Sequence, residues 1–297
     1  MVRINDIFGQ KMNTGVKIAG FFLLLRSESY FCKMKTIAII GGGNMGGAVA
    51  RALTQCSLVE QVKVSDINEE TLRNLQNFNN RIEVSTNNAE NVKGADLVIL
   101  AVKPWLVDSV IAGIKDAMDY KKQVFMSIAA CVPFEHLAAQ LEKKGALPSM
   151  FRMIPNTGID VLQSVSSISA YTNTTQEQRD QIMAIFGELG KAFLVPENQL
   201  NAMMALSSCG IAYAFRYIRA AVEGGVEMGI YPQTAKQVVA QTLRGAIDLL
   251  ETNDSHPEME IDKVTTPGGT TIKGLNEMEA NGFTNAVIKG LKASYIK

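Results

Sequence analysis

The stretch TIAIIGGGNMG, residues 36–46, decides how this chain folds. Its first half, Thr36–Ile40, is short and apolar, which predicts a buried strand. Its second half has the spacing GxGxxG, and apolar residues then recur at helical spacing from Met45 to Leu53. A strand, a glycine loop and a helix in this order predict a site where the N-terminus of the helix holds the pyrophosphate of a dinucleotide.

Three glycines have separate tasks in such a loop. Gly41 permits the tight turn, Gly43 lets a phosphate approach the backbone, and Gly46 lets the helix pack closely on the strand. An ordinary glycine-rich turn is the alternative. The strand before the loop, the helix after it and an acid further on favour the cofactor site.

That acid is Asp66, which ends a second predicted strand over residues 62–66. A carboxylate at this place accepts hydrogen bonds from a ribose 2′-hydroxyl and repels a 2′-phosphate. Asp66 therefore favours NADH over NADPH. An aspartate that caps a helix or a turn is the alternative interpretation.

Strands and helices continue to alternate up to Val195. We predict further strands over residues 81–85, 96–102, 124–129, 151–154, 165–170 and 192–195, and helices over 69–77, 133–144 and 176–189. Such alternation predicts βαβ units and a doubly wound sheet. Residues 101–104 (AVKP) then lie where the fourth strand ends, which is the edge at which such sheets bind ligands. Lys103 is either a cofactor contact or an ordinary lysine at a strand end.

From Glu197 to Lys297 the sequence predicts no strand. Helical patterns run over residues 198–228, 234–252, 270–280 and 284–295. We therefore expect a dinucleotide-binding domain over 34–195 and an all-helical domain over 196–297. Residues 1–33 differ from both, because their apolar run Ile18–Leu25 is too short to span a bilayer and precedes a fresh start at Met34. We expect 1–33 to be an N-terminal extension outside the fold.

Composition excludes several classes of function. The chain has 297 residues, with 29 Lys and Arg against 29 Asp and Glu, so its net charge is zero. This balance argues against nucleic-acid and anionic-membrane partners, which require excess positive charge. The four cysteines and two histidines form no cluster with metal-ligand spacing, so we expect no metal. Reduced thiols are typical of a cytoplasmic protein.

The most unusual stretch is VTTPGGTTI, residues 264–272. Its Pro-Gly-Gly turn delivers free N–H groups and two hydroxyls to the N-terminus of a helix. Such an arrangement binds a carboxylate without any Arg or Lys. A turn that only caps the helix is the alternative.

With these motifs, the chain from Met34 onward resembles pyrroline-5-carboxylate reductase. The resemblance is carried by the glycine loop, by residues 101–104 (AVKP), 127–130 (SIAA) and 155–157 (PNT), and most specifically by 264–272 with Gly282-Phe283 and His256-Pro257. It implies an α/β fold, an N-terminal Rossmann-type doubly wound sheet followed by an all-α C-terminal dimerisation domain. It also implies NAD(P)H-dependent reduction of 1-pyrroline-5-carboxylate to L-proline, the last step of proline biosynthesis.

The resemblance assigns roles to individual residues. Those implied to hold the pyrophosphate form the glycine loop: Ile40, Gly41, Gly42, Gly43, Asn44, Met45 and Gly46. Asn88 matches an adenosine-side contact. Those implied on the nicotinamide side follow the fourth and fifth strands: Ala101, Val102, Lys103, Pro104, Ser127, Ile128 and Ala129. Those implied to border the reaction centre are Asn156 and Thr157. Those implied to bind the substrate are Gly268, Gly269, Thr270, Thr271 and, more loosely, Asp254.

The implied reaction suits a chain that has no set of histidines arranged for acid–base catalysis. Hydride passes from the cofactor to the imine carbon, and a protonated imine is already electrophilic, so the protein mainly positions the partners. Thr271 is implied to lie beside the ring nitrogen as the catalytic residue. The family's substrate site also lies at a dimer interface, which implies a homodimer or higher homo-oligomer.

The chain departs from the family pattern at three places. Residues 207–213 read SSCGIAY where the family has SGSGPAY, Cys131 replaces a glycine, and Gly158 replaces a proline. The changes at Ser208, Cys209 and Ile211 leave open a catalytically weakened, cofactor-binding regulatory homologue. A 3-hydroxyacid oxidoreductase is a second alternative, but such enzymes need a catalytic lysine in the long helix after the sheet. This chain has no lysine from Ala192 to Ala235.

Overall fold

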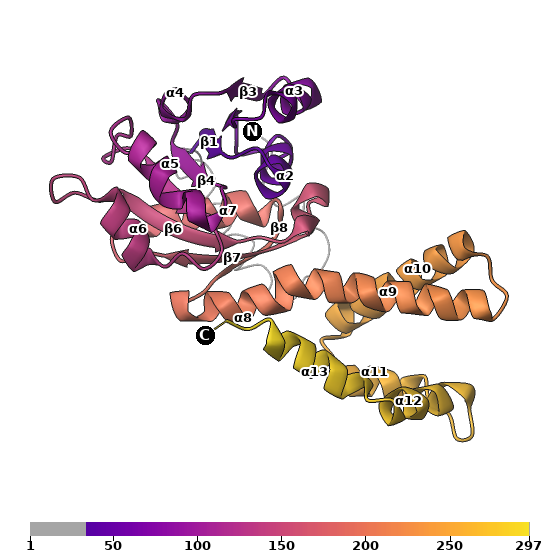
Figure 1. The fold of residues 1–297 in the computed structure, drawn as a ribbon. Helices are drawn as coiled ribbons and strands as arrows, with labels where there is room; N and C mark the ends of the chain where they lie inside the picture. Colours follow the sequence, from indigo (N-terminus) through magenta and orange to yellow (C-terminus); the bar gives the residue numbers. More distant parts are fainter. Residues whose placement is uncertain (1–33, 297) are drawn as a thin grey trace, which may run out of the picture.

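The computed structural model describes residues 34–296 (Figure 1). The expectation for residues 1–33 falls outside this range. The described chain forms a sheet covered by helices on both faces, from which a helical arm projects (Figure 1). This arrangement confirms the predicted fold class.

The sheet has eight strands in the order β3-β2-β1-β4-β5-β6-β7-β8. They are β1 (Thr36–Ile40), β2 (Gln61–Ser65), β3 (Ile82–Ser85), β4 (Leu97–Leu100), β5 (Val124–Ser127), β6 (Ser149–Ile154), β7 (Ser164–Ala170) and β8 (Gly190–Leu194). Strands β1 to β6 are parallel, whereas β7 runs antiparallel to β6 and β8 is parallel to β7.

Strand order changes direction between β1 and β4, which creates the crevice where sheets of this kind bind ligands. In the register, Ile40 pairs with both Ser65 and Leu100. The three segments that follow, from Gly41, Asp66 and Ala101, therefore leave the sheet at one common edge.

Alternate residues of each strand feed two separate cores. Ile37 and Ile39 pack with α2 (Asn44–Leu53), α3 (Glu69–Phe78) and α7 (Gln176–Gly187). Ala38 and Ile40 pack with α4 (Asn88–Val92), α5 (Val107–Ile114) and α6 (Phe134–Leu141). This two-sided burial follows from the period of two along a strand, and it explains why β4 is apolar at every position.

Two of these helices were not predicted. Helix α4 has only five residues, too few for a helical period to be recognised. Helix α5 follows the Lys103-Pro104 pair directly and is apolar over most of its surface, so its sequence resembles a buried strand as much as a helix.

The last third of the chain is helical, as expected. Its elements are α8 (Leu200–Met204), a π-helical segment (Ala205–Cys209), α9 (Gly210–Glu227), α10 (Pro232–Asn253), α11 (Pro257–Lys263), α12 (Thr270–Ala280) and α13 (Phe283–Ala293). The predicted helix over 198–228 is thus interrupted by the π-helical segment, and α11 was not predicted. Helices α9 and α10 project from the sheet, and α13 returns towards α8 (Figure 1).

A partly buried ion pair holds the base of this arm. Arg152 on β6 is 5% exposed and donates to Glu197 Oε1 at 2.6 Å. The same oxygen accepts from the backbone N–H of Phe134 at 2.7 Å. Within residues 34–296, none of the helices combines the length and apolarity that crossing a bilayer requires.

Candidate active site

The glycine loop is tightly packed against the end of β4. Gly41 has φ of +99°, and a Cβ atom there would lie 2.6 Å from the carbonyl oxygen of Ala101. A Cβ at Gly46 would lie 1.9 Å from the carbonyl oxygen of Gly41. Both positions therefore require glycine, because any side chain would separate α2 from the strands. Gly43, by contrast, faces open space, with no atom within 4 Å of an added Cβ.

The side chain of Asp66 is hydrogen-bonded to the backbone of this loop. Its Oδ2 accepts from the backbone N–H of Gly42 at 2.6 Å, and its Oδ1 accepts from that of Asn68 at 2.9 Å. Asp66 thus has the turn-capping role that was the alternative interpretation. A carboxylate has about four acceptor positions, so these two bonds leave it able to accept from a ribose hydroxyl as well.

The segments after β4 and β5 lie beside the glycine loop. The backbone N–H of Ala101 donates to Ile40 O at 2.8 Å, and that of Ile128 donates to Leu100 O at 3.0 Å. Ser127 is buried, and its Oγ accepts from Ala129 N at 3.3 Å. Lys103 is exposed and directly precedes the 3₁₀ turn Pro104–Leu106. The structure thus brings the sites implied for pyrophosphate and nicotinamide to one edge.

Asn156 forms the next part of this edge. Its Oδ1 accepts from Gly158 N at 3.1 Å and from Val165 N at 3.3 Å, and its Nδ2 donates to Ser207 O at 3.4 Å. Neighbouring Ser208 donates from Oγ to Pro155 O at 2.7 Å. The π-helical segment therefore supports Asn156 directly, whereas Thr157 is exposed.

Sequence reasoning missed this contact between the π-helical segment and Asn156. Segments of this kind are frequent at functional sites. The signal available in the sequence was the cluster of departures at Ser208, Cys209 and Ile211, two of which lie on the segment itself and the third just after it.

Asn88 starts α4 after β3, next to its capping residue Asn87, whose side chain accepts from Glu90 N at 3.2 Å. Helix α4 is held against β1 because the buried side chain of Asn91 donates to Ile39 O at 3.1 Å. Asn88 is therefore placed on the same side of the sheet as the helices of the second core.

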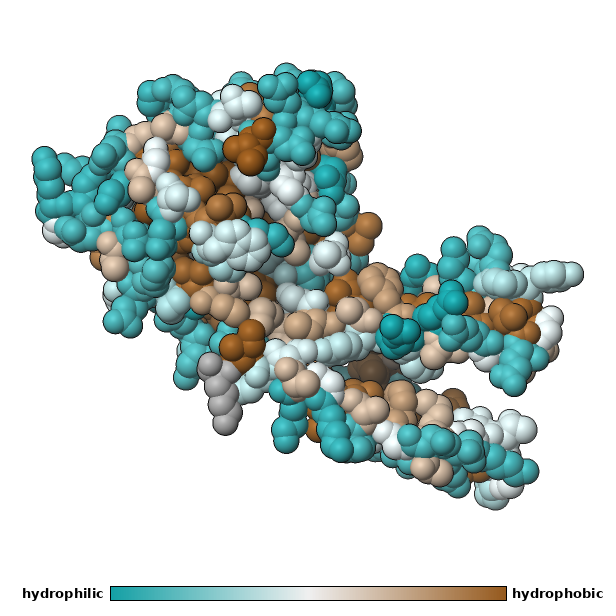
Figure 2. All heavy atoms as spheres, in the orientation of Figure 1, coloured by the Kyte–Doolittle hydropathy of each residue, from teal (hydrophilic) through white to brown (hydrophobic). Residues whose placement is uncertain are grey.

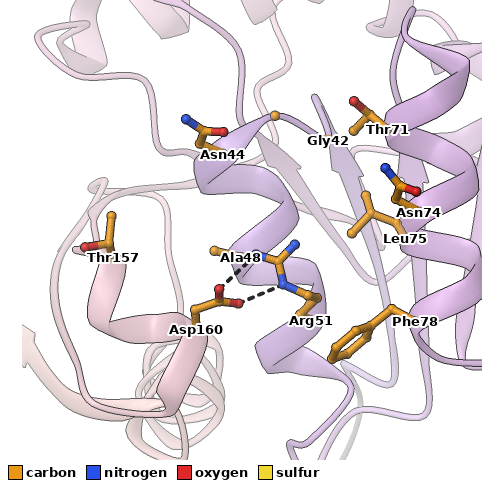
Figure 3. A pocket seen from close by; sticks show the side chains of 11 residues that line it. Gly42, Asn44, Ala48, Arg51, Thr71, Asn74, Leu75, Phe78, Thr157 and Asp160 are labelled. Atoms are coloured by element: carbon orange, nitrogen blue, oxygen red, sulfur yellow. Dashed lines mark hydrogen bonds and ion pairs between the residues drawn. The ribbon is translucent and has the colours of Figure 1, made fainter. Parts of the chain in front are cut away.

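A pocket of about 610 Å³ opens in front of α2. Figure 3 shows its lining, which joins the glycine loop (Gly42, Gly43, Asn44) to α3 on one side and to Thr157 and Asp160 on the other. The loop and the segment after Asn156 thus share one cavity.

The Pro-Gly-Gly turn lies elsewhere. Gly268 has φ of +70°, Gly269 N donates to Thr266 O at 2.9 Å, and Thr270 starts α12. Thr270 and Thr271 are exposed. The turn lies at the far end of the helical arm, away from the sheet (Figure 1). One chain therefore does not bring Gly268–Thr271 to the carboxyl edge of its own sheet.

Asp254 ends α10 in the left-handed conformation, with φ of +46°. Its neighbours are held by Glu260 of α11, whose Oε1 accepts from Ser255 Oγ at 2.5 Å and from Lys263 Nζ at 2.6 Å. The hydrogen bond from Lys263, followed by that from Ser255, lowers the pKa of Glu260 to about 2. His256 caps α11, because its Nδ1 accepts from Glu258 N at 3.3 Å.

Strongly raised pKa values occur away from this edge. Burial raises the pKa of Cys56 to about 11 and that of Tyr120 to about 12. Cys56 lies just after α2 and Tyr120 lies between α5 and β5. In the part of the chain that the structure describes, no group of His, Cys, Asp and Glu is arranged to hold a metal ion.

Two family models match the chain. One is described as pyrroline-5-carboxylate reductase dimerisation and matches residues 197–297. The other is described as NADP oxidoreductase coenzyme F420-dependent and matches residues 36–131. The two matches fall on the helical arm and on the parallel part of the sheet.

Individual proteins match over most of the chain. Pyrroline-5-carboxylate reductase 1 of Dictyostelium discoideum is 35% identical over 87% of the chain, which spans 48% of that protein's length. Pyrroline-5-carboxylate reductase of Methanosarcina acetivorans is 36% identical over 87% of the chain and 96% of its own length. The crystal structure of Plasmodium falciparum pyrroline carboxylate reductase with NADP bound has the same fold, with a TM-score of 0.79, 23% identity, and coverage of 88% of this chain and 95% of that one. By the extent of these matches, the chain belongs to the pyrroline-5-carboxylate reductase family.

Proposed function

We propose that the protein reduces 1-pyrroline-5-carboxylate to L-proline, at the expense of a reduced nicotinamide cofactor and one proton. Membership of the family supports this activity. The observation that carries it is the coexistence, in one chain, of a glycine loop at a sheet switch point and a Pro-Gly-Gly turn at a helix N-terminus. The first suits a pyrophosphate and the second suits a small carboxylate.

The residues present fit a dinucleotide. The open space in front of Gly43 leaves room for a phosphate, and the first N–H groups of α2 have no partner within the helix. The bound cofactor supplies the hydride. Ala101–Pro104 and Ser127–Ala129 would line its nicotinamide side, Asn88 its adenosine side, and Asn156 and Thr157 the reaction centre.

The Gly268–Thr271 turn would bind the substrate carboxylate. Its backbone N–H groups at the start of α12 favour a negative charge. The hydroxyl of Thr271 would accept a hydrogen bond from the N–H of the protonated imine and orient the ring for attack. Asp254, at the end of α10, would border the same site. No strong acid is needed, because a protonated imine accepts hydride readily.

We further propose that a second copy of the chain completes each site. The turn and the carboxyl edge of the sheet lie far apart within one protomer (Figure 1). Two helices of the arm, α9 and α10, bury only Gly225 and Ala235, and α11 to α13 bury no residue fully. Brown apolar patches lie along the arm in Figure 2. Apolar faces of this kind are typical of a homodimer interface.

NADH is the proposed preferred cofactor. Asp66 stands at the end of β2, and Glu69 and Glu70 occupy the first turn of α3 beside it. Three carboxylates near the expected ribose would repel a 2′-phosphate. We also propose that residues 34–195 and 196–297 act as the cofactor and substrate domains, and that the enzyme is cytoplasmic, where its free cysteines stay reduced.

One assay tests the proposed function. The full chain is mixed with 1-pyrroline-5-carboxylate and either NADH or NADPH, and the absorbance of the reduced nicotinamide is followed. Oxidation of the cofactor with formation of proline is expected, faster with NADH. Cofactor binding without oxidation would favour a regulatory homologue instead. In a second mixture of a 3-hydroxyacid with the oxidised cofactor, reduction of the cofactor would favour the other reductase class.

A further inference from the structure

A two-point ion pair connects α2 to the segment that follows Asn156. Arg51 Nε lies 2.8 Å from Asp160 Oδ1, and Arg51 Nη2 lies 3.0 Å from Asp160 Oδ2 (Figure 3). The side chains are 30% and 43% exposed, respectively. Two parallel bonds between planar groups define an orientation as well as a separation.

The arginine end belongs to the cofactor side of the site. Arg51 lies two turns along α2 from Asn44, or roughly 10 Å. Helix α2 is packed closely behind its glycine loop, because a Cβ atom at Gly46 would lie only 3.0 Å from Ala101 Cβ and most of the helix is buried. The guanidinium of Arg51 lies over Gly47, where the absence of a side chain leaves room for it.

The aspartate end belongs to the reaction side. Asp160 lies in the 3₁₀ segment Thr157–Val161, which begins directly after Asn156. The segment is short and stiff, because Asn156 Oδ1 accepts from Gly158 N and the backbone N–H of Gln163 donates to Gly158 O at 2.9 Å. A displacement of Asp160 would therefore also displace Thr157.

Both ends line the same pocket as Asn44 and Thr157. Below the surface, Ile159 is fully buried and anchors the segment in the core. Ile159 thus prevents the segment from leaving the sheet. The ion pair, at the surface, sets how far the segment lies from α2 along the cavity.

We propose that Arg51 and Asp160 are positioning residues for hydride transfer: they hold the Asn156–Thr157 segment at a set distance from the glycine loop. The proposal rests on the reductase activity proposed above. Arg51 does not act as a phosphate ligand, because its guanidinium is already paired with Asp160 and the N-terminus of α2 is two turns away.

The sizes of the expected losses of activity and of stability distinguish this role from a purely structural one. A partly exposed ion pair contributes little to stability, so its loss should shift the melting temperature by no more than about 4 °C. Misplacement of reacting groups by about 1 Å can lower a rate by about a hundredfold. Activity is therefore expected to fall much more than stability.

A double-mutant cycle on the full chain tests the proposal. Arg51→Met, Asp160→Asn and the double variant are compared with wild type for kcat, for both KM values, and for the deuterium isotope effect with a 4-deuterated cofactor. We expect each single variant to lower kcat about tenfold, with a larger isotope effect, and the double variant to lose no more than either single one. The dissociation constant for the cofactor alone, measured by calorimetry, should stay within about twofold.

Glu60→Gln is the matched control. It weakens the Lys35–Glu60 ion pair, which joins the starts of β1 and β2 at the opposite edge of the sheet. Its kcat should equal that of wild type. The proposal is overturned if both single variants keep wild-type kcat, if their losses add in the double variant, or if Arg51→Met weakens cofactor binding while Asp160→Asn does not. Wild-type protein without turnover overturns the proposed function itself and the positioning role with it.

Discussion

The carboxylate of Asp66 accepts a hydrogen bond of 2.6 Å from the backbone N–H of Gly42. One side chain thus supports the glycine loop and also places a negative charge at the end of β2. The two roles can be separated by substitution, because the single amide oxygen of an asparagine can keep the bond from Gly42 N, at the loss of the one from Asn68 N, but carries no charge.

Asp66→Asn is expected to change cofactor choice while the loop stays folded. Loss of the negative charge removes repulsion of a 2′-phosphate, so the ratio of kcat/KM for NADPH to that for NADH should rise roughly tenfold, equivalent to about 1.4 kcal/mol. Steady-state kinetics with both cofactors measure this ratio. An unchanged ratio would leave Asp66 with the loop-supporting role alone.

Thr271 offers a second pair of variants. Thr271→Val keeps the shape of the side chain and removes the hydroxyl that would hydrogen-bond to the N–H of the protonated imine, so kcat at saturating substrate should fall roughly a hundredfold. Thr271→Ser keeps a hydroxyl and should retain most of the turnover. Equal kinetics for the two variants would remove Thr271 from the mechanism.

Ser208 tests the link between the π-helical segment and the reaction side. Ser208→Ala deletes the donor to Pro155 O and leaves that carbonyl group unpaired, which should lower the free energy of unfolding by about 1–2 kcal/mol and lower kcat as well. Ser109→Ala is the matched control, since Ser109 Oγ bonds only to Leu106 O within the start of α5. Loss of stability with wild-type kcat would contradict a link to the site.

Cys131 carries backbone strain that can be relieved. It has φ of +63°, in the left-handed region that costs a non-glycine residue about 1–2 kcal/mol. Cys131→Gly should therefore raise the melting temperature by roughly 2–4 °C, whereas Cys131→Ala should not. Because Cys131 is exposed and Cys56 is 1% exposed with its pKa raised to about 11, a thiol reagent at pH 8 should label Cys131 in the folded protein and spare Cys56.

The sheet could be predicted from sequence because its signals are local. Buried strands such as β4 are continuous apolar runs, and the glycine loop has a spacing that few other structures require. Short helices escaped prediction, since the five residues of α4 hold too few positions for a period. The reversal of β7 also escaped it, because strand direction depends on pairing across the sheet and not on the residues within the strand.

Within the site, single motifs could be predicted but not their contacts. The Arg51–Asp160 pair joins residues 109 positions apart, and the Ser208–Pro155 bond joins residues 53 positions apart. Neither has a signature in local sequence. Asp66 was predicted as a site residue, yet its bond to Gly42 follows only from the way β1 and β2 end side by side.

The projecting arm links the folding of each chain to the association of two chains in the proposed homodimer. Since its helices bury so little within one protomer, association supplies much of the stability, and that contribution grows with protein concentration. The melting temperature should therefore rise as the protein is concentrated. In the proposed homodimer, dilution should separate the subunits and remove each Gly268–Thr271 turn from its neighbour's sheet, so activity per chain should fall in dilute solution.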